Sequence, residues 1–199
     1  MTTRASLLAQ RKLVRLSKAY AAEPDRPTQH KCFLAHHAED AEEVLAFVEE
    51  FEDVIIPRSI GVTDDDDFID SDDDDYVMSR IRQDYLGSTT VTVVLLGKCT
   101  WARKYVDWET YSSLRLSKHS TRNGLMSVRL ASGAGAKWPA RLKANLNTSG
   151  ADGYARAYTY PTSAASLRAH VQDAFDARTS RAHLIKPLTA RRRNNASCP

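Results

Sequence analysis

The feature that most constrains the fold is a run of mostly aliphatic residues in the middle of the chain, VTVVLL at positions 91–96. Such a run indicates a strand that is buried on both faces, which is typical of a parallel sheet. The run ends at Gly97, and a short polar loop then leads into a helix that carries Glu109. Because ligands of open α/β sheets bind beyond the carboxyl ends of the strands, this loop and helix form the first candidate site.

The rest of the sequence supplies the other elements of such a sheet. Further strands are expected at residues 31–35, 54–57, 125–130 and 154–160, and helices at residues 40–51, 76–86, around Glu109 and from Ser163 onward. Five strands that alternate with helices predict right-handed crossovers and a parallel sheet. The commonest order for five strands is 2-1-3-4-5, so we expect a flavodoxin-like three-layer α/β sandwich.

Prolines and charge divide the chain into three parts. Pro24 and Pro27 separate a basic N-terminal extension, residues 1–29, from a domain at residues 30–178. We expect the extension to be helical. A basic tail follows at residues 179–199, and because apolar periodicity is lost there, we expect it to be mobile.

Charge, hydropathy and the acidic block give no indication of nucleic acid, membrane or calcium binding. The net charge of +3 does not by itself indicate a nucleic-acid partner. No stretch approaches the roughly 20 apolar residues of a membrane span, so we expect no membrane partner either. Aspartates at 64–67 and 72–75 form an acidic block that lacks the glycine and closing glutamate of an EF-hand loop. We therefore expect a solvated loop rather than a calcium site.

The three cysteines, Cys32, Cys99 and Cys198, show no motif spacing. A free cysteine in apolar surroundings behaves as a small hydrophobic residue. Free thiols fit a reducing compartment, so we expect the protein to be cytoplasmic.

Glu109 is the leading candidate for chemistry. It lies between two aromatic residues, Trp108 and Tyr111, and Asp107 points to another side of the helix, so the two carboxylates do not form a pair. A single carboxylate under aromatic walls suits the stabilisation of a ribose oxocarbenium ion, as in glycosyl transfer. The alternative is a solvated helix glutamate, because glutamate is a good helix former.

Two adjacent histidines, His36 and His37, end the first predicted strand. In the 2-1-3-4-5 order they face the loop at residues 97–101 across one crevice. No third ligand stands at metal spacing, so we expect no metal. Asp40, with Glu43 three residues later, has the spacing of a helix capping box and is expected to be an N-cap.

Three blocks of sequence carry a family resemblance. They are residues 33–40 (FLAHHAED), residues 91–97 with Thr100 and residues 105–109 (YVDWE), and residues 124–130 with residues 158–161 (YTYP). The blocks resemble the strands and the glutamate-bearing helix of the bacterial TIR-like family of Thoeris antiphage defence, which is related to the Toll/interleukin-1 receptor fold. The resemblance covers about residues 31–175, and the second block is the most specific.

The resemblance implies an enzyme of the NAD glycohydrolase or ADP-ribosyl cyclase type, with NAD as substrate and no separate cofactor. Glu109 maps onto the glutamate that cleaves the nicotinamide–ribose bond. The product would be a cyclic or conjugated ADP-ribose signal for a separate effector protein, and a homo-oligomer is expected. In this site Trp101, Tyr105 and Trp108 would wall the pocket, with Ala35, His36 and His37 opposite. The family usually has serine at the position of Ala35 and an aromatic residue at that of His36.

Two other functions remain open at this point. The chain could be a non-catalytic TIR-like interaction module that acts by assembly with a partner effector, with Glu109 in a structural role. On fold analogy alone it could be a nucleoside-processing transferase. Consumption of NAD by the purified protein separates the first hypothesis from the interaction module.

Overall fold

The computed structural model describes residues 3–21, 29–59, 76, 86–116, 121–148, 151–186 and 190–198 of the chain. The acidic block at residues 64–75 and nearly all of the helix expected at residues 76–86 lie outside the described residues.

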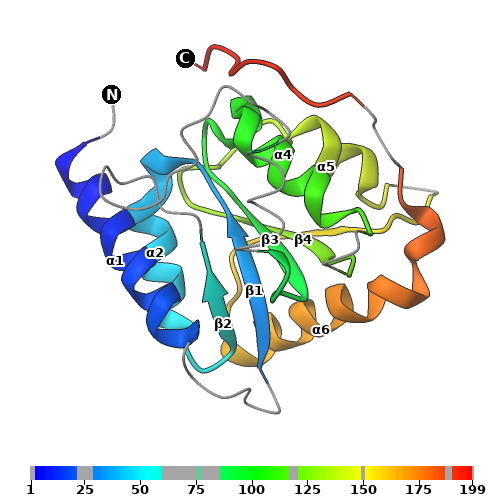
Figure 1. The fold of residues 1–199 in the computed structure, drawn as a ribbon, viewed down its shortest axis with the longest axis horizontal. Coiled ribbons are helices and arrows are strands. Elements are labelled where there is room, and N and C mark those ends of the chain that lie inside the picture. The colour runs from blue at the N-terminus through cyan, green and yellow to red at the C-terminus, as the bar shows by residue number, and fades with distance from the viewer. Residues whose placement is uncertain are drawn as a thin grey trace.

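The sheet has the predicted topology. Its strands are β1 (His30–Ala35), β2 (Ile55–Arg58), β3 (Val91–Leu96), β4 (Gly124–Arg129) and β5 (Arg156–Tyr158). They lie in the order β2-β1-β3-β4-β5, and every neighbouring pair is parallel (Figure 1). The flavodoxin-like α/β prediction is confirmed. All six residues of the central strand β3 are buried, as the aliphatic run predicted.

Helices cover both faces of the sheet. They are α1 (Arg4–Ala21), α2 (Ala41–Glu50), α4 (Lys104–Ser113), α5 (Ala140–Asn145) and α6 (Ala164–Ser180). Ser163 caps α6 through a capping box with Ser166, in agreement with the sequence. The short α5 lies within residues 132–153, a stretch that holds four glycines and Pro139.

Alternation along the strands gives each face its own core. Leu34 and Val93 point into a cluster shared with α1, α2 and α6, whereas Ala35 and Val94 point into a second cluster with α4 and α5. Successive side chains of a strand face opposite sides of a sheet, so this division follows from sequence register. Glu109 therefore belongs to the layer that Ala35 faces.

The N-terminal extension is helical and packs onto the domain. One face of α1 is buried, including Leu13 and Val14, and it lies beside α2 in Figure 1. The Arg58 side chain donates a hydrogen bond of 2.9 Å to the Ser17 carbonyl at the edge of β2. The domain boundaries at residues 29/30 and 178/179 stay predictions.

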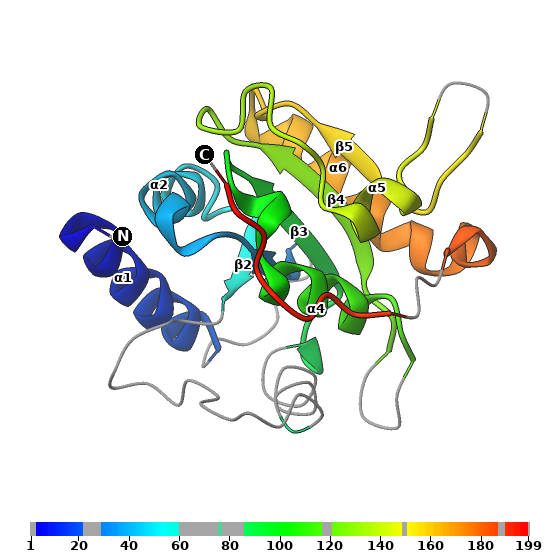
Figure 2. The ribbon, with the colours of Figure 1, turned by 90° about the horizontal axis from the view of Figure 1, so that it is seen from above.

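The prediction of a mobile tail is wrong for residues 190–198, which lie along α4 (Figure 2). The cysteines, which show no pairing motif in the sequence, are not all free. Cys99 and Cys198 form a disulfide, and Cys32 is free and buried in the core. These two cysteines are 99 positions apart, so their pairing depends on tertiary packing and leaves no spacing motif in the sequence.

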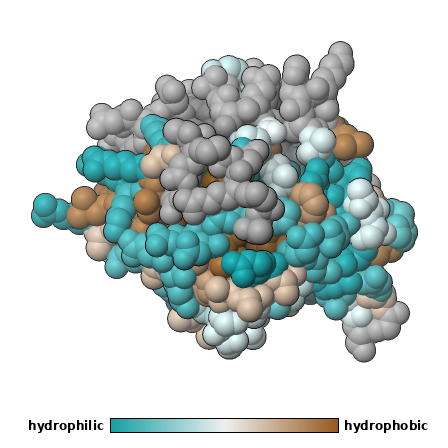
Figure 3. All heavy atoms as spheres, turned by 90° about the horizontal axis from the view of Figure 1, so that it is seen from below, coloured by the Kyte–Doolittle hydropathy of each residue, from teal (hydrophilic) through white to brown (hydrophobic). Residues whose placement is uncertain are grey.

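Hydrophilic side chains predominate on the described part of the face drawn in Figure 3. Among the described helices, none combines the length and the apolar character needed to cross a bilayer.

Candidate functional site

The candidate site lies at the carboxyl ends of β1 and β3. Ala35 pairs in register with Val94, so His36 and His37 leave the sheet at the same edge as the loop that follows Leu96. This is the switch point of the sheet, because β1 is followed by β2 on one side and β3 by β4 on the other. The loop makes a short 3-10 turn, Thr100–Ala102, and α4 then begins at Lys104.

Asp40 ties the loops of this edge together. Its Oδ2 accepts a hydrogen bond of 3.1 Å from the Thr100 hydroxyl, and its Oδ1 accepts one of 3.4 Å from the Ser132 hydroxyl. The Thr100 hydroxyl in turn accepts from the Gly97 N–H at 2.9 Å. A Cβ atom at Gly97 would lie 2.1 Å from the Asp40 carboxylate, so a larger residue there would displace this carboxylate from its present position.

Asp40 is the N-cap residue of α2, as predicted, but the capping box expected with Glu43 does not form. Its side chain makes no cap hydrogen bond at the start of α2, and Glu43 accepts instead from the Ser132 backbone N–H. The Asp40 carboxylate instead binds the Thr100 hydroxyl, 60 positions away in the sequence. Burial raises the pKa of Asp40 to about 6, against the opposing effect of the Thr100 hydrogen bond.

This pKa gives a testable dependence of stability on pH. The folded state holds the Asp40 proton more tightly than the unfolded chain, so the contribution of this proton to stability is complete below about pH 4. It is lost as the pH rises through about 6. Thermal unfolding of wild type and Asp40→Asn should therefore diverge with pH, the wild type losing stability relative to the variant. A difference in melting temperature that is the same at every pH would contradict the raised pKa.

Glu109 is buried on the inner side of α4. Its exposed fraction is 8%, and its neighbours Val106 and Thr110 are also buried. Burial raises the pKa of Glu109 well above its usual value. Its Oε2 atom has no hydrogen-bond partner among the described residues. Glu109 is therefore not a solvated helix glutamate, which was the alternative interpretation.

Asp107 faces a different side of α4, as the helical spacing predicted. Its carboxylate accepts two hydrogen bonds from Arg141, of 2.9 and 3.1 Å, and one of 2.9 Å from the Arg192 backbone N–H. The Arg141 side chain is only 2% exposed. Asp107 is thus committed to an ion pair, and the two carboxylates of α4 do not act on one substrate atom.

The two histidines have different surroundings. The His36 Nδ1 atom donates to the Leu34 carbonyl at 3.0 Å, because a carbonyl can only accept, and this leaves Nε2 as the acceptor. Burial lowers the pKa of His36. Burial and the nearby Arg103 charge lower the pKa of His37, while Glu39 opposes them. Both imidazoles are therefore neutral near pH 7.

Arg103 is a further candidate for the site that sequence reasoning missed. It stands in the β3–α4 loop directly before α4, next to an equally basic Lys104, so the sequence did not single it out. Its Nε atom is buried and has no hydrogen-bond partner among the described residues. The same holds for Glu109 Oε2 and for His37 Nε2, which only approaches the Glu39 carboxylate, at 3.4 Å.

These unpartnered atoms point to a ligand. Only four buried side-chain polar atoms in the described part of the chain lack a hydrogen-bond partner, and three of them belong to the segments at the carboxyl ends of β1 and β3. The fourth, on Asn123, stands at the start of β4. Buried polar groups normally have partners, so these atoms mark the loops after β1 and β3 and the inner side of α4 as the candidate site.

The three aromatic residues predicted to line the pocket make different contacts. Trp101 lies under Lys137, whose Nζ atom is 4.8 Å from the ring centroid. Tyr105 packs edge-on against Trp108 with ring centroids 5.4 Å apart. Trp108 is 1% exposed, and its indole N–H donates to the Arg192 carbonyl at 2.7 Å. Their roles as pocket walls, like that of Ala35, stay predictions.

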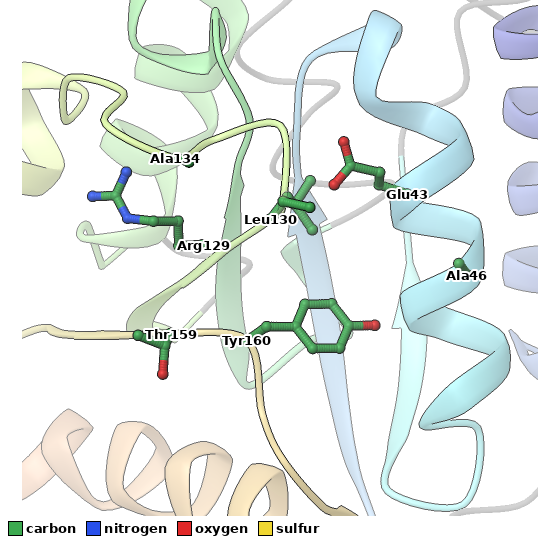
Figure 4. A pocket seen from close by; sticks show the side chains of 8 residues that line it. Glu43, Ala46, Arg129, Leu130, Ala134, Thr159 and Tyr160 are labelled. Atoms are coloured by element: carbon green, nitrogen blue, oxygen red, sulfur yellow. The ribbon is translucent and has the colours of Figure 1, made fainter.

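A separate pocket of about 440 Å³ lies between α2 and the ends of β4 and β5 (Figure 4). It contains none of the predicted site residues, and its lining is Glu43, Ala46, Arg129, Leu130, Ala131, Ala134, Thr159 and Tyr160. The Tyr160 hydroxyl donates to Glu50, and Arg129 stacks over Trp138, so these two polar groups already have partners. Within the described ranges, no three potential metal ligands gather at one place.

A family model for the TIR-like domain of the Thoeris protein ThsB matches residues 33–134, half of the chain. The matched stretch runs from β1 through the loop after β4 and includes His36, His37, Arg103 and Glu109. A comparison with curated proteins gave no match.

Proposed function

The chain belongs to the family of TIR-like domains of the Thoeris protein ThsB, which indicates a role in antiphage defence, and from this premise we propose that it cleaves NAD. The reaction breaks the bond between nicotinamide and ribose and yields a cyclic or conjugated ADP-ribose product. This product acts as a signal for a separate effector protein. We place the enzyme in the cytoplasm, and we propose that it works as a homo-oligomer.

The burial of Glu109 carries this proposal. Departure of nicotinamide leaves positive charge on the ribose, and a carboxylate beside it stabilises that charge. The interaction is strongest where water is excluded, because the local dielectric is low. An 8% exposed carboxyl group with an unpartnered oxygen, on the helix that follows the central strand, supports this role. The cationic nicotinamide ring would favour its ionised form.

The other residues of the crevice suit the rest of the substrate. Arg103 can give charge-assisted hydrogen bonds to the NAD pyrophosphate, for which its planar guanidinium is well shaped. The neutral His36 and His37, with Ala35, line the opposite side. Trp101, Tyr105 and Trp108 wall the pocket and exclude water, which favours cyclisation over hydrolysis.

The test is incubation of the purified protein with NAD, with and without lysate of phage-infected cells, followed by mass spectrometry. We expect stoichiometric release of nicotinamide and an ADP-ribose-derived product. If NAD stays intact under both conditions, the non-catalytic interaction module becomes the better explanation.

A further inference from the structure

The C-terminal segment at residues 190–198, here called the strap, is fastened to the outer side of α4 (Figure 2). The Arg192 backbone makes two of its bonds. The Arg192 N–H donates to Asp107 at 2.9 Å, and the Arg192 carbonyl accepts from the Trp108 indole at 2.7 Å. The Ala190 carbonyl accepts from Arg141 at 2.9 Å. These contacts hold the first two turns of the helix that carries Glu109.

The end of the strap holds the loop that leads into α4. The Ala196 N–H donates to the Ala102 carbonyl at 2.8 Å, and the Arg192 guanidinium donates to the same carbonyl at 3.1 Å. The Asn195 side chain accepts from the Lys104 backbone N–H at 2.9 Å, so it satisfies a donor in the first turn of α4 that the helix itself cannot.

A disulfide joins the end of the strap to the loop between β3 and α4. Cys198 is linked to Cys99, which directly precedes Thr100, the residue that holds Asp40. Cys198 is partly exposed, so an incoming thiolate can reach its sulfur. In a reducing compartment disulfides that do form are typically transient, catalytic or redox-sensing.

We propose that the Cys99–Cys198 disulfide is a redox latch that keeps the strap on α4 and so sets the activity of the Glu109 site. This inference rests on the proposed function for its effect on activity, but not for the latch itself. With the disulfide closed, the β3–α4 loop and the start of α4 are held in place. With the disulfide open, only non-covalent contacts retain residues 195–198, and the Glu109 helix loses part of its support.

The opening step is a thiol–disulfide exchange with a dithiol reductant. A thiolate of the reductant attacks the Cys198 sulfur, and Cys99 leaves as a thiolate that takes up a proton. The second thiol of the reductant then displaces Cys198 from the mixed disulfide. Two thiols form on the protein, and the reductant is oxidised to its own disulfide.

The latch is tested first without NAD, by limited trypsin digestion followed by mass spectrometry after reduction. The strap offers cleavage sites at Arg191, Arg192 and Arg193. Because proteolysis requires local opening, we expect cleavage there to be at least about tenfold faster in reduced than in oxidised protein. Cys198→Ser should be cut at the fast rate under both conditions, and Cys32→Ala, which leaves the disulfide intact, should behave as wild type. Equal rates for oxidised and reduced wild type would overturn the latch.

The effect on the site is tested by NAD cleavage in buffers of graded dithiol potential. We expect kcat to fall at least about tenfold on reduction with little change in KM, because a small displacement of a catalytic group slows chemistry more than binding. The potential at which the rate of NAD cleavage is half-maximal should match the midpoint potential of the change in trypsin cleavage. The Cys198→Ser variant should cleave NAD slowly at every potential. A rate independent of potential would overturn the regulatory effect even if the latch opens. Absence of cleavage in every form would refute the proposed function, while the trypsin result would still decide the latch.

Discussion

Glu109→Gln is expected to lower the rate of NAD cleavage by about a hundredfold or more, since preorganised electrostatic groups of this kind contribute about 3–4 kcal/mol to transition-state stabilisation. Glutamine keeps the shape of the side chain but cannot carry the negative charge that the ribose cation needs. The same substitution should raise the melting temperature near pH 7, because burial penalises the ionised carboxyl group and the amide removes that penalty.

The two effects have a common pH signature. The folded state binds the Glu109 proton more tightly than the unfolded chain, so the wild type gains stability as the pH falls toward the ordinary glutamate pKa. The stability advantage of Glu109→Gln should therefore shrink in acid. Nicotinamide release and thermal unfolding measure the two effects, with the exposed Glu42→Gln on α2 as the matched control. Full activity in Glu109→Gln would remove Glu109 from the mechanism.

Arg141→Leu is expected to destabilise the fold by about 3–5 kcal/mol, because it removes the ionic partner of the Asp107 carboxylate, which is only 12% exposed. The substitution also removes the hydrogen bond from Arg141 to the Ala190 carbonyl and the cation–π contact with the Tyr111 ring, whose centroid lies 4.9 Å from the guanidinium. Urea unfolding would measure the change in the free energy of unfolding. The double variant Asp107→Asn, Arg141→Leu should recover part of the loss, because it no longer buries an unpaired charge. A single-variant effect below about 1 kcal/mol would show that the pair is solvated.

The sequence predicted those features that depend on burial pattern along the chain. The aliphatic run at residues 91–96 predicted the central strand, because a strand covered on both faces needs apolar side chains in both directions. Helical spacing separated Asp107 from Glu109. The family resemblance was confirmed by the match over residues 33–134. The fifth strand is shorter than expected, Arg156–Tyr158, within a stretch that alternates large and small residues.

The features that the sequence did not predict depend on contacts between distant residues. The hydrogen bond from Thr100 to Asp40 spans 60 positions, and the disulfide spans 99. Local capping rules therefore gave the right position for Asp40 but not the partners of its side chain, and spacing rules gave no pairing for the cysteines. The burial of Glu109 and the unpartnered Nε of Arg103 also arise only when α4 packs on the sheet.

Glu109 is expected to differ in protonation between the free and the substrate-bound protein. Desolvation favours the protonated form of Glu109 while the crevice holds no cation. The proposed chemistry requires the ionised form, so we expect a bound cation to lower the pKa of Glu109 and substrate affinity to increase with pH. A cationic ligand and a proton therefore compete for the same buried carboxylate. The burial of Glu109 in this way favours cationic ligands over neutral ones.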